Sequence, residues 1–516
     1  MRVLIFHGYL LRGTGSNIYN ASLARSMVRL GHEVHLFCQD RHAAEADFVD
    51  AVGRWSAGRL HIEVVRRPIR CTAYLPDIGD LLPVYVADRY EGFEARPYPQ
   101  LTDAEIERYI AANVAAIRDV VAASAPEVAL ANHVVMGPVI LARALGGTVP
   151  YAVKIHGSAL EYTVRPNLAR FGGYAREGLA AANGILAGSR HTAKSLWDAV
   201  EMPDLPERTR LLPPGVDVHR FRPRPPAEAT DRLRRLADRL DLVTATWGGD
   251  AGAAKALRAI DPRADRVVSY LGKLIVSKGV DLLIAAWPLV TAQVPDARLQ
   301  IVGFGTYRDA LEELVRVLGA GDLAAARTIA ARGRELEGGP PGELRYLAAF
   351  LDDLHGEQRA RYLTAASTAM NRVHFTGRIE HGDVPDLLSA SEALVVPSTF
   401  PEAFGMVVAE AACCGALPLS AAHSGLAEVT AELAPVLDED LRPLLSFELG
   451  PAAVRDIADK LVRWLTLDER AQVTKSLAEF ARGEFGWERI AEGVINAALG
   501  RLTELPPVAD ETGSRL

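Results

Sequence analysis

The chain has 516 residues, of which 49% are hydrophobic, 24% charged and 7% aromatic, and its formal net charge is -8. A chain of this length usually builds more than one core, so we expect two domains of roughly 200 to 250 residues. The acidic balance gives no overall attraction to nucleic acid. The four cysteines lack the spacing of a metal site, and we expect them to be reduced thiols of a cytoplasmic protein.

The apolar stretch at the N-terminus is too short for a signal peptide, and the sequence has no run of about 18 consecutive apolar residues. We therefore expect neither export nor a membrane span. A peripheral membrane contact stays open, because Arg232-Leu233-Arg234-Arg235 is a basic stretch in a segment of helical character.

Strands and helices alternate along residues 1–222. An apolar strand is expected at Val3 to Phe6, a glycine-containing loop at Gly13 to Asn17, a helix at Ile18 to Leu30 and a second strand at Glu33 to Phe37. Further strands are expected at residues 60–65, 128–132, 151–155 and 184–187, and helices at 103–124, 136–145, 175–182 and 190–200. This alternation predicts a parallel sheet covered on both faces, in an N-terminal Rossmann-like domain.

A charged, proline-bearing stretch, residues 223–265, is predicted to be a linker region, with a helix-like part at 227–240 and glycines at 248–252. A second series follows over residues 266–485. Its strands are expected at 266–271, 298–302, 373–376, 393–396 and 417–420, and its helices at 280–290, 384–390, from 405, at 452–465 and at 468–482. Residues 486–516 contain a last helix, 487–501, which is a candidate to pack back on the N-terminal domain.

Two segments are longer than simple alternation requires. Residues 66–101 are rich in aromatic residues and proline, and they fit either a substrate-facing excursion or a structural flap. Residues 307–372 contain Gly338-Gly339-Pro340-Pro341-Gly342 between helical stretches. Two doubly wound domains facing across a cleft would bind ligands at the carboxyl ends of their strands.

The most informative motif is Pro401-Glu402-Ala403-Phe404-Gly405-Met406-Val407-Val408-Ala409-Glu410, which follows an apolar strand. A helix that opens near Gly405 presents free backbone N–H groups to an anion, and the two glutamates can accept hydrogen bonds from hydroxyl groups. That combination suits a sugar nucleotide. The alternative is that Glu402 is a first-turn helix carboxylate and Glu410 a solvated surface residue.

Several short motifs occur in a characteristic order along nearly the whole chain. They are Gly13 to Asn17, Gly31-His32-Glu33-Val34, His156-Gly157, Pro214-Gly215-Val216-Asp217, Gly272-Lys273-Leu274 with Lys278-Gly279, Val302-Gly303-Phe304-Gly305, Phe375-Thr376-Gly377-Arg378, and the Glu402/Glu410 pair. Each is weak alone. In this order they resemble the family 4 retaining glycosyltransferases, which implies the α/β fold named GT-B.

The resemblance implies a role for each matched residue. Lys273, Lys278, Glu402 and His156 are the expected catalytic residues, with the lysines at the diphosphate, Glu402 at hydroxyls of the donor sugar and His156 opposite the transferred sugar. The remaining donor-binding residues implied are Gly15, Gly303, Arg378, Ile379, Phe404, Gly405, Met406, Val407 and Glu410. Among these, Glu410 is expected to hold the ribose diol and Arg378-Ile379 to meet the base.

Two positions depart from the family pattern. Lys273 stands where the family usually has arginine, which removes the planar fork of a bidentate contact but keeps a point charge. Ser424-Gly425-Leu426-Ala427-Glu428 matches the family's GGxxE motif without its first glycine, so the geometry of that turn is open.

The resulting hypothesis is a retaining transferase that moves a hexosyl group from a nucleoside diphosphate sugar to an unidentified acceptor bound by the N-terminal domain, residues 1–222, with no metal and no cofactor. Departure of the diphosphate builds negative charge, which cations and N–H donors stabilise. A phosphorylase or sugar-nucleotide epimerase of the same fold is an alternative, and a non-catalytic sugar-nucleotide sensor or partner subunit is another. A dinucleotide-binding enzyme is disfavoured because Gly13-Thr14-Gly15-Ser16-Asn17-Ile18 lacks the third glycine.

Overall fold

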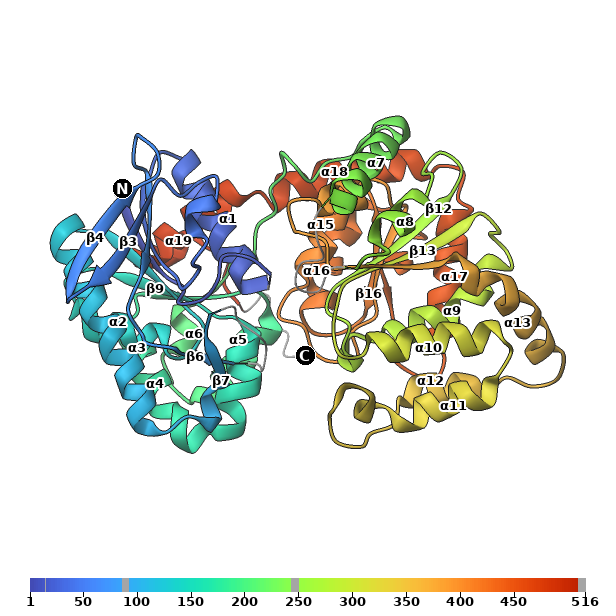
Figure 1. The fold of residues 1–516 in the computed structure, drawn as a ribbon, viewed down its shortest axis with the longest axis horizontal. Coiled ribbons are helices and arrows are strands. Elements are labelled where there is room, and N and C mark those ends of the chain that lie inside the picture. The colour runs from blue at the N-terminus through green and yellow to red at the C-terminus, as the bar shows by residue number, and fades with distance from the viewer. Residues whose placement is uncertain (14, 86–91, 243–249, 509–516) are drawn as a thin grey trace. The chain divides into compact units, whose positions relative to one another are not determined.

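The computed structural model describes residues 1–13, 15–85, 92–242 and 250–508. It divides into two compact units, which are drawn in Figure 1. Unit 1 comprises Met1–Gly215 with Phe485–Leu516, and unit 2 comprises Val216–Glu484. The segment predicted as a linker, 223–265, lies in unit 2, and residues 247–249 of its glycine-containing part are outside the described residues. Helix α19 (Trp487–Ala498) belongs to unit 1.

The main sheet of unit 1 has, within the described residues, nine strands in the order β11-β10-β9-β8-β1-β2-β5-β3-β4. Their bounds in chain order are β1 Arg2–Phe6, β2 Glu33–Phe37, β3 Ala51–Ser56, β4 Arg59–Val64, β5 Cys71–Leu75, β8 Val128–Asn132, β9 Tyr151–Lys154, β10 Gly184–Ala187 and β11 Thr209–Leu211. All neighbours are parallel except β3 and β4, which are antiparallel. The expectation of a fully parallel sheet is therefore wrong at this edge.

The antiparallel edge arises from a tight hairpin. Ala57 and Gly58 connect β3 to β4 with φ of 50° and 72°, and two successive left-handed residues form the turn that matches the twist of paired strands. The sequence pattern missed β3, β5 and β11. A second, two-stranded sheet of β6 (Leu81–Val84) and β7 (Glu94–Pro97) occupies part of the aromatic-rich segment 66–101.

Helices cover both faces of the unit 1 sheet. Their bounds are α1 Gly15–Arg29, α2 Asp103–Ser124, α3 Gly137–Leu145, α4 Leu168–Ala180, α5 Arg190–Val200, α6 Leu205–Arg208 and α19 Trp487–Ala498. Helix α2 begins where the sequence predicts because Thr102 and Glu105 form a capping box, in which each side chain accepts a hydrogen bond from the other's backbone N–H.

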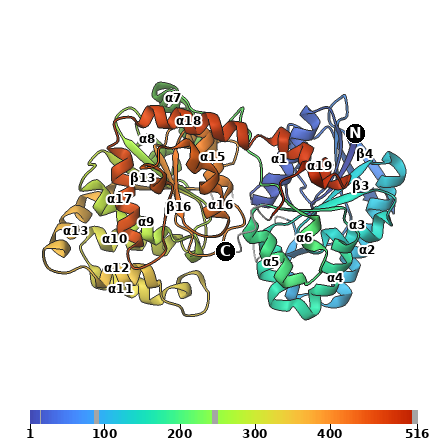
Figure 2. The same ribbon diagram turned by 180° about the vertical axis from the view of Figure 1, so that it is seen from behind.

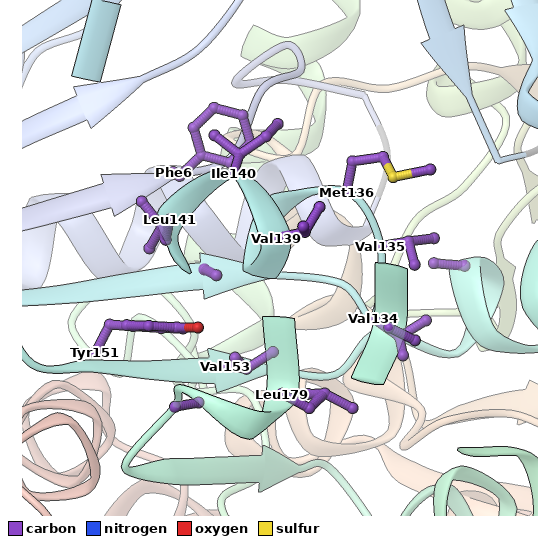
Figure 3. Close-up of a cluster of buried hydrophobic side chains, with 14 of the residues drawn as sticks. Phe6, Val134, Val135, Met136, Val139, Ile140, Leu141, Tyr151, Val153 and Leu179 are labelled. Atoms are coloured by element: carbon purple, nitrogen blue, oxygen red, sulfur yellow. The ribbon is translucent and has the colours of Figure 1, made fainter. Parts of the chain in front are cut away.

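Alternation along β1 assigns its side chains to two separate cores. Leu4 and Phe6 pack with α2, α3 and α4, and part of that cluster is shown in Figure 3. Val3 and Ile5 pack on the opposite face with α1 and α19. Because α19 contributes Trp487 and Ile490 to this second core, the end of the chain is a structural part of unit 1.

Two helices of unit 1 start earlier than the sequence pattern indicates. Helix α1 begins at Gly15 rather than Ile18, so most of the predicted glycine loop is the first helical turn, and residue 14 lies outside the described residues. Helix α4 begins at Leu168 rather than at residue 175. Gly172 and Gly173 weaken its helical propensity, but burial of Phe171 in the core favours the longer helix.

Unit 2 contains, within its described residues, a six-stranded sheet in the order β14-β13-β12-β15-β16-β17. The strands are β12 Arg266–Leu271, β13 Ala297–Val302, β14 Val373–Gly377, β15 Ala393–Val396, β16 Leu417–Ala421 and β17 Ser446–Phe447. All neighbouring strands are parallel. The doubly wound pattern predicted for this half is therefore confirmed.

The helices of unit 2 include four that form the long segment 307–372. Their bounds are α7 Pro226–Leu242, α8 Ala253–Arg258, α9 Val280–Thr291, α10 Arg308–Gly319, α11 Leu323–Arg332, α12 Arg345–Asp352, α13 Gly356–Ala369, α14 Val384–Leu388, α15 Met406–Cys414, α16 Ser424–Leu433, α17 Ala453–Leu465 and α18 Arg470–Glu484. Helices α7 and α8 pack on the sheet through a core that includes Leu233, Leu257 and Val267.

Candidate donor site in unit 2

The candidate site lies in unit 2, where five parallel strands end at one edge of the sheet. The loops after β12, β13, β14 and β15, together with helix α15, carry the donor-binding residues predicted for this half of the chain. Because the carboxyl ends of parallel strands share an edge, residues far apart in sequence come together there. This placement explains why motifs spread over residues 271–410 belong to one site.

The loops after β12 and β13 approach each other closely. A Cβ on Gly303 would lie 1.8 Å from the carbonyl oxygen of Gly272, and one on Gly305 would lie 2.1 Å from that of Leu274. The N–H of Leu274 donates to the carbonyl of Phe304 at 2.8 Å. Gly303 thus has a structural reason to be glycine, apart from any contact with a ligand.

Lys278 and Glu402 are brought into direct contact although the sequence separates them by 124 positions. The Nζ of Lys278 donates to Oε1 of Glu402, and the Oγ of Ser398 donates to the same oxygen at 2.7 Å. Gly279 allows this approach, because it has a φ of +63° and a Cβ there would lie 2.0 Å from the carbonyl oxygen of Pro397. The two side chains are 28% and 22% exposed, so the pair remains accessible to a ligand.

The charge of Lys278 controls the ionisation of Glu402. Burial alone raises the pKa of Glu402, but the Lys278 ammonium and the hydrogen bonds from Lys278 and Ser398 together outweigh it and hold the pKa below its ordinary value. Glu402 is therefore a carboxylate at neutral pH, able to accept hydrogen bonds from sugar hydroxyls.

Lys273 lies in the loop after β12, and its carbonyl accepts a hydrogen bond from the hydroxyl of Tyr270 at 2.8 Å. Arg378 pairs with Glu380 at 2.7 Å, and the neighbouring Ile379 is buried. The convergence of Lys273 with Lys278 on a diphosphate stays a prediction, as does the contact of Arg378 and Ile379 with a base.

The loop before α15 has the form that the sequence suggested. Gly405 has a φ of +94° and precedes the first helical residue, Met406. The side chain of Phe404 is buried, while Met406 and Val407 are partly exposed. The first turn of α15 thus offers backbone N–H groups at the same sheet edge as Lys278.

Glu410 is buried, with only 2% of its surface exposed. Its Oε1 lies 2.7 Å from Nε2 of His381, whose ring is 5.3 Å from that of Phe221. The alternative that Glu410 is a solvated surface residue is therefore wrong. His381 was missed, because a lone histidine four residues after a glycine carries no signal of its own.

Ser424 and His423 form a further part of the site that the sequence left open. Ser424 takes the left-handed conformation with a φ of 52°, and its Oγ accepts a hydrogen bond from the N–H of Glu402 at 2.9 Å. Nε2 of His423 lies 2.7 Å from the carbonyl oxygen of Ser398. Serine therefore occupies a backbone conformation that suits glycine, and its hydroxyl holds the Glu402 loop.

The residues predicted in unit 1 lie at the carboxyl edge of its own sheet. His156 follows β9, and its Nε2 is 2.9 Å from Oδ1 of Asn132, the last residue of β8. Burial, together with the charges of His133, Lys154 and His7, lowers the pKa of His156, so its imidazole is neutral at pH 7. Gly15 is the exposed first residue of α1. Their predicted roles stay predictions.

Among the described residues, no three or more histidine, cysteine and acidic side chains are grouped in a way that could hold a metal ion. Over the same residues, no helix has both the length and the apolar character needed to cross a membrane.

Comparison with known proteins gives matches in both units. The family described as Glycosyltransferase Family 4 matches residues 13–220, and the family described as Glycosyl transferases group 1 matches residues 345–474. The D-inositol 3-phosphate glycosyltransferase of Xylanimonas cellulosilytica is 27% identical over 62% of this chain and 57% of its own length. A GDP-mannose-dependent alpha-(1-6)-phosphatidylinositol monomannoside mannosyltransferase of Mycolicibacterium smegmatis is 36% identical over 22% of each chain.

Each of these two curated relatives is thus matched over less than two thirds of its length. Solved structures are similar over nearly all of the chain. Sucrose-phosphate synthase from Thermosynechococcus elongatus has a TM-score of 0.56 at 18% sequence identity, and the match covers 98% of this chain and 98% of the other. Anabaena HepE in complex with UDP-glucose has a TM-score of 0.55 at 16% identity, over 98% of this chain and 100% of the other. With one family match in each unit, the chain is similar to the family 4 and group 1 glycosyltransferases, and its likeness to the solved structures, together with the two parallel-sheet units, shows the GT-B fold.

Proposed function

We propose that this glycosyltransferase moves a hexosyl group from a nucleoside diphosphate sugar to an acceptor hydroxyl, with retention of anomeric configuration and without a metal ion. The observation that carries the proposal is the cluster of Lys278, Glu402, the α15 N-terminus and Glu410 at one sheet edge. It combines a cation, helical N–H donors and two carboxylates, which are the groups that a sugar nucleotide requires.

In this proposal each group of the cluster would receive a different part of the donor. Lys278 and the first turn of α15 would receive the diphosphate, and Lys273 would add a second charge. Glu402, held as a carboxylate, would accept from hydroxyls of the sugar. The buried Glu410 would accept from the ribose diol, since a carboxylate binds two hydroxyl donors at once.

The donors of similar proteins support a hexose donor without fixing its base. The Mycolicibacterium relative is GDP-mannose-dependent, whereas Anabaena HepE is in complex with UDP-glucose. The predicted contacts of Arg378 and Ile379 with the base would decide between such donors. The acceptor is proposed to bind unit 1, where His156 would lie opposite the transferred sugar, and Gly15 would contact the donor.

Retention fits a front-face mechanism in which the leaving phosphate takes the proton of the attacking hydroxyl. The bond from the anomeric carbon to the phosphate oxygen breaks, and a bond from that carbon to the acceptor oxygen forms on the same face of the sugar. The proton of the acceptor hydroxyl passes to the departing diphosphate. Lys278 supplies charge to that leaving group. We further propose that no cofactor takes part, and that the protein acts in a reducing compartment such as the cytoplasm, because all four cysteines are free and buried.

The proposal is tested by incubating the protein with a panel of nucleoside diphosphate sugars and a cell-extract acceptor pool, with and without EDTA. We expect one donor to yield a glycosylated product whose NMR spectrum shows the anomeric configuration of the donor, at a rate that EDTA leaves unchanged. An inverted product or loss of activity in EDTA would contradict the mechanism. Sugar release that requires orthophosphate would indicate a phosphorylase, and donor epimerisation without acceptor an epimerase. Binding without transfer or hydrolysis would indicate a sensor.

A further inference from the structure

The segment from Gly338 to Gly342, whose glycines and prolines stand out in the sequence, belongs to the connection between α11 and α12. The two helices lie side by side in both views of unit 2 (Figures 1 and 2). The loop that joins them, residues 333–342, lies outside both family matches, 13–220 and 345–474. Those matches therefore assign it no role, and its contacts have to explain it.

Backbone contacts close this loop on itself. The N–H of Arg334 donates to the carbonyl of Gly342 at 3.1 Å, and the N–H of Gly339 donates to the carbonyl of Arg334 at 2.9 Å. Gly333 has a φ of +51°, and a Cβ there would lie 1.6 Å from the carbonyl oxygen of Gly342. The two ends of the loop thus meet at a distance that requires glycine. Inside the closed loop lies the short 3-10 turn Arg334–Glu337.

Glu337, the last residue of that turn, reaches the loop that carries Lys278. Its Oε2 accepts a hydrogen bond from the N–H of Val276 at 2.7 Å, across 61 positions of the sequence. Nε of Arg334 lies 3.4 Å from the other carboxylate oxygen. The side chain of Glu337 is only 12% exposed, and Val276 is buried. A hydrogen bond in such surroundings is stronger than one in water.

This hydrogen bond caps a turn that cannot cap itself. Val276 begins the 3-10 turn Val276–Lys278, and the first N–H groups of a helical turn have no partner within it. The preceding residue is Ile275, whose side chain has no hydrogen-bond acceptor. Glu337 supplies the missing acceptor from a distant part of the chain, as a capping side chain does at the start of a longer helix.

The same turn is held on its other side by the segment that leads to Glu402. The N–H of Thr399 donates to the carbonyl of Ser277 at 2.9 Å. Lys278, the last residue of the turn, then contacts Glu402 with its ammonium group. The backbone that presents Lys278 therefore lies between two supports, of which the loop 333–342 is one.

We propose that Glu337 is a positioning residue for the transfer reaction, because its cap on the turn 276–278 fixes the backbone from which Lys278 reaches the diphosphate. The inference rests on the proposed function of Lys278. Lysine is a point charge on a flexible stem, so the place of its charge depends on the backbone that carries it. A misplacement of about 1 Å can cost about 100-fold in rate. Glu337 acts through the Val276 N–H and touches no substrate.

The test compares Glu337→Ala, Glu337→Gln and the control Glu335→Ala in amide hydrogen exchange of residues 274–279 and in steady-state transfer. Glutamine keeps an oxygen that accepts from the Val276 N–H, whereas alanine does not. We expect Glu337→Ala to speed exchange in this segment and to lower kcat/KM roughly tenfold, because a buried N–H loses its acceptor. Glu337→Gln should stay within about threefold of the wild type in both. Glu335 is exposed in the same turn, so Glu335→Ala should change neither.

A double variant separates positioning from general stabilisation of unit 2. If Glu337 acts through Lys278, Glu337→Ala should lower kcat/KM much less in a Lys278→Ala background than in the wild type. Equal losses in the two backgrounds would overturn the proposal, and so would a Glu337→Gln variant as impaired as Glu337→Ala. Unchanged exchange of residues 274–279 in Glu337→Ala would refute the cap itself, whatever the donor is.

Lys278→Ala, measured in the same assays, distinguishes failure of this inference from failure of the proposed function. Loss of activity in Lys278→Ala beside a fully active Glu337→Ala would overturn the positioning role and leave the proposed function intact. Full activity of Lys278→Ala would contradict the phosphate assignment of Lys278, and the positioning role with it.

Discussion

Replacing Lys278 by alanine removes the ammonium group that donates to Glu402 at the proposed phosphate site. The loss has two consequences. The diphosphate would lose a cation, and Glu402, which burial alone drives toward the protonated form, would lose the charge that keeps its pKa low. Both effects reduce the stabilisation of the transition state relative to the free enzyme.

The expected loss of activity in Lys278→Ala can be worked out from the partial exposure of the Lys278–Glu402 pair. A unit charge about 4 Å from another contributes about 4 kcal/mol at an effective dielectric constant of about 20, the value suited to sites near a protein surface. Part of this is offset, because Lys278 already pairs with Glu402 when no donor is bound. A net loss of about 3 kcal/mol agrees with removal of other preorganised charge stabilisers and corresponds to roughly 150-fold in kcat/KM.

The assay is steady-state transfer from the donor that the panel identifies. Lys278→Arg keeps the charge and should retain much of the activity, whereas Lys278→Ala should not. Lys475→Ala, which removes an exposed lysine of α18, serves as the matched control. The double variant Lys278→Ala/Glu402→Gln should cost less than the sum of the single variants, because the two side chains are in contact. If Lys278→Ala keeps kcat/KM within about threefold of the wild type, the assignment of Lys278 to the leaving group is wrong.

Three further predictions concern the glycine-like turn, the buried histidines and the paired loops. Ser424→Ala and Ser424→Gly both remove the hydroxyl that accepts a hydrogen bond from the Glu402 N–H, but only glycine relieves the strain of the left-handed backbone. We expect both variants to lower kcat/KM by roughly tenfold, and Ser424→Gly to be the more stable of the two in thermal unfolding. Full activity of Ser424→Gly would show that the hydroxyl does not position Glu402. Burial, with a smaller contribution from His7, lowers the pKa of His133, so the unfolded state binds a proton near pH 6.5 that the folded state does not, and stability falls as pH drops below that value. His133→Phe should reduce this fall by about 1.4 kcal/mol per pH unit in urea unfolding between pH 6 and 5, whereas parallel slopes for variant and wild type would contradict the argument. Gly303→Ala should destabilise the chain by at least about 2 kcal/mol, since a Cβ at Gly303 would lie 1.8 Å from a backbone oxygen, and an unchanged unfolding midpoint would show that these loops separate easily.

Long apolar strands and well-capped helices of this fold could be predicted from sequence. β12 and β15 have the predicted bounds, and so does α2, whose Thr102 and Glu105 mark its start. β3, which lies between β5 and β4, was missed because its arginine, tryptophan and serine break the apolar run that is typical of a buried strand. Periodicity alone does not distinguish such a strand from a loop.

The residues of the candidate site also divide into those that the sequence pattern indicated and those that it missed. The pattern identified Glu402, Glu410 and Lys278 because their spacing and their neighbouring glycines are local features. It did not find His381 or Ser398, which partner these residues across loops from different strands. Partners that depend on which strand ends are adjacent become visible only when the sheet order is known.

The central claim is that Glu402, Glu410 and Lys278 form a nucleoside diphosphate sugar site, and nucleotide titration tests it most directly. UDP, GDP and ADP are titrated calorimetrically into the wild type, Glu410→Gln and the exposed-residue control Glu479→Gln. We predict that one nucleotide binds the wild type and the control equally, and that Glu410→Gln binds it roughly tenfold more weakly, because a charge-assisted hydrogen bond to the ribose diol is lost. Absence of binding by all three nucleotides, or equal affinity in Glu410→Gln, would contradict the account.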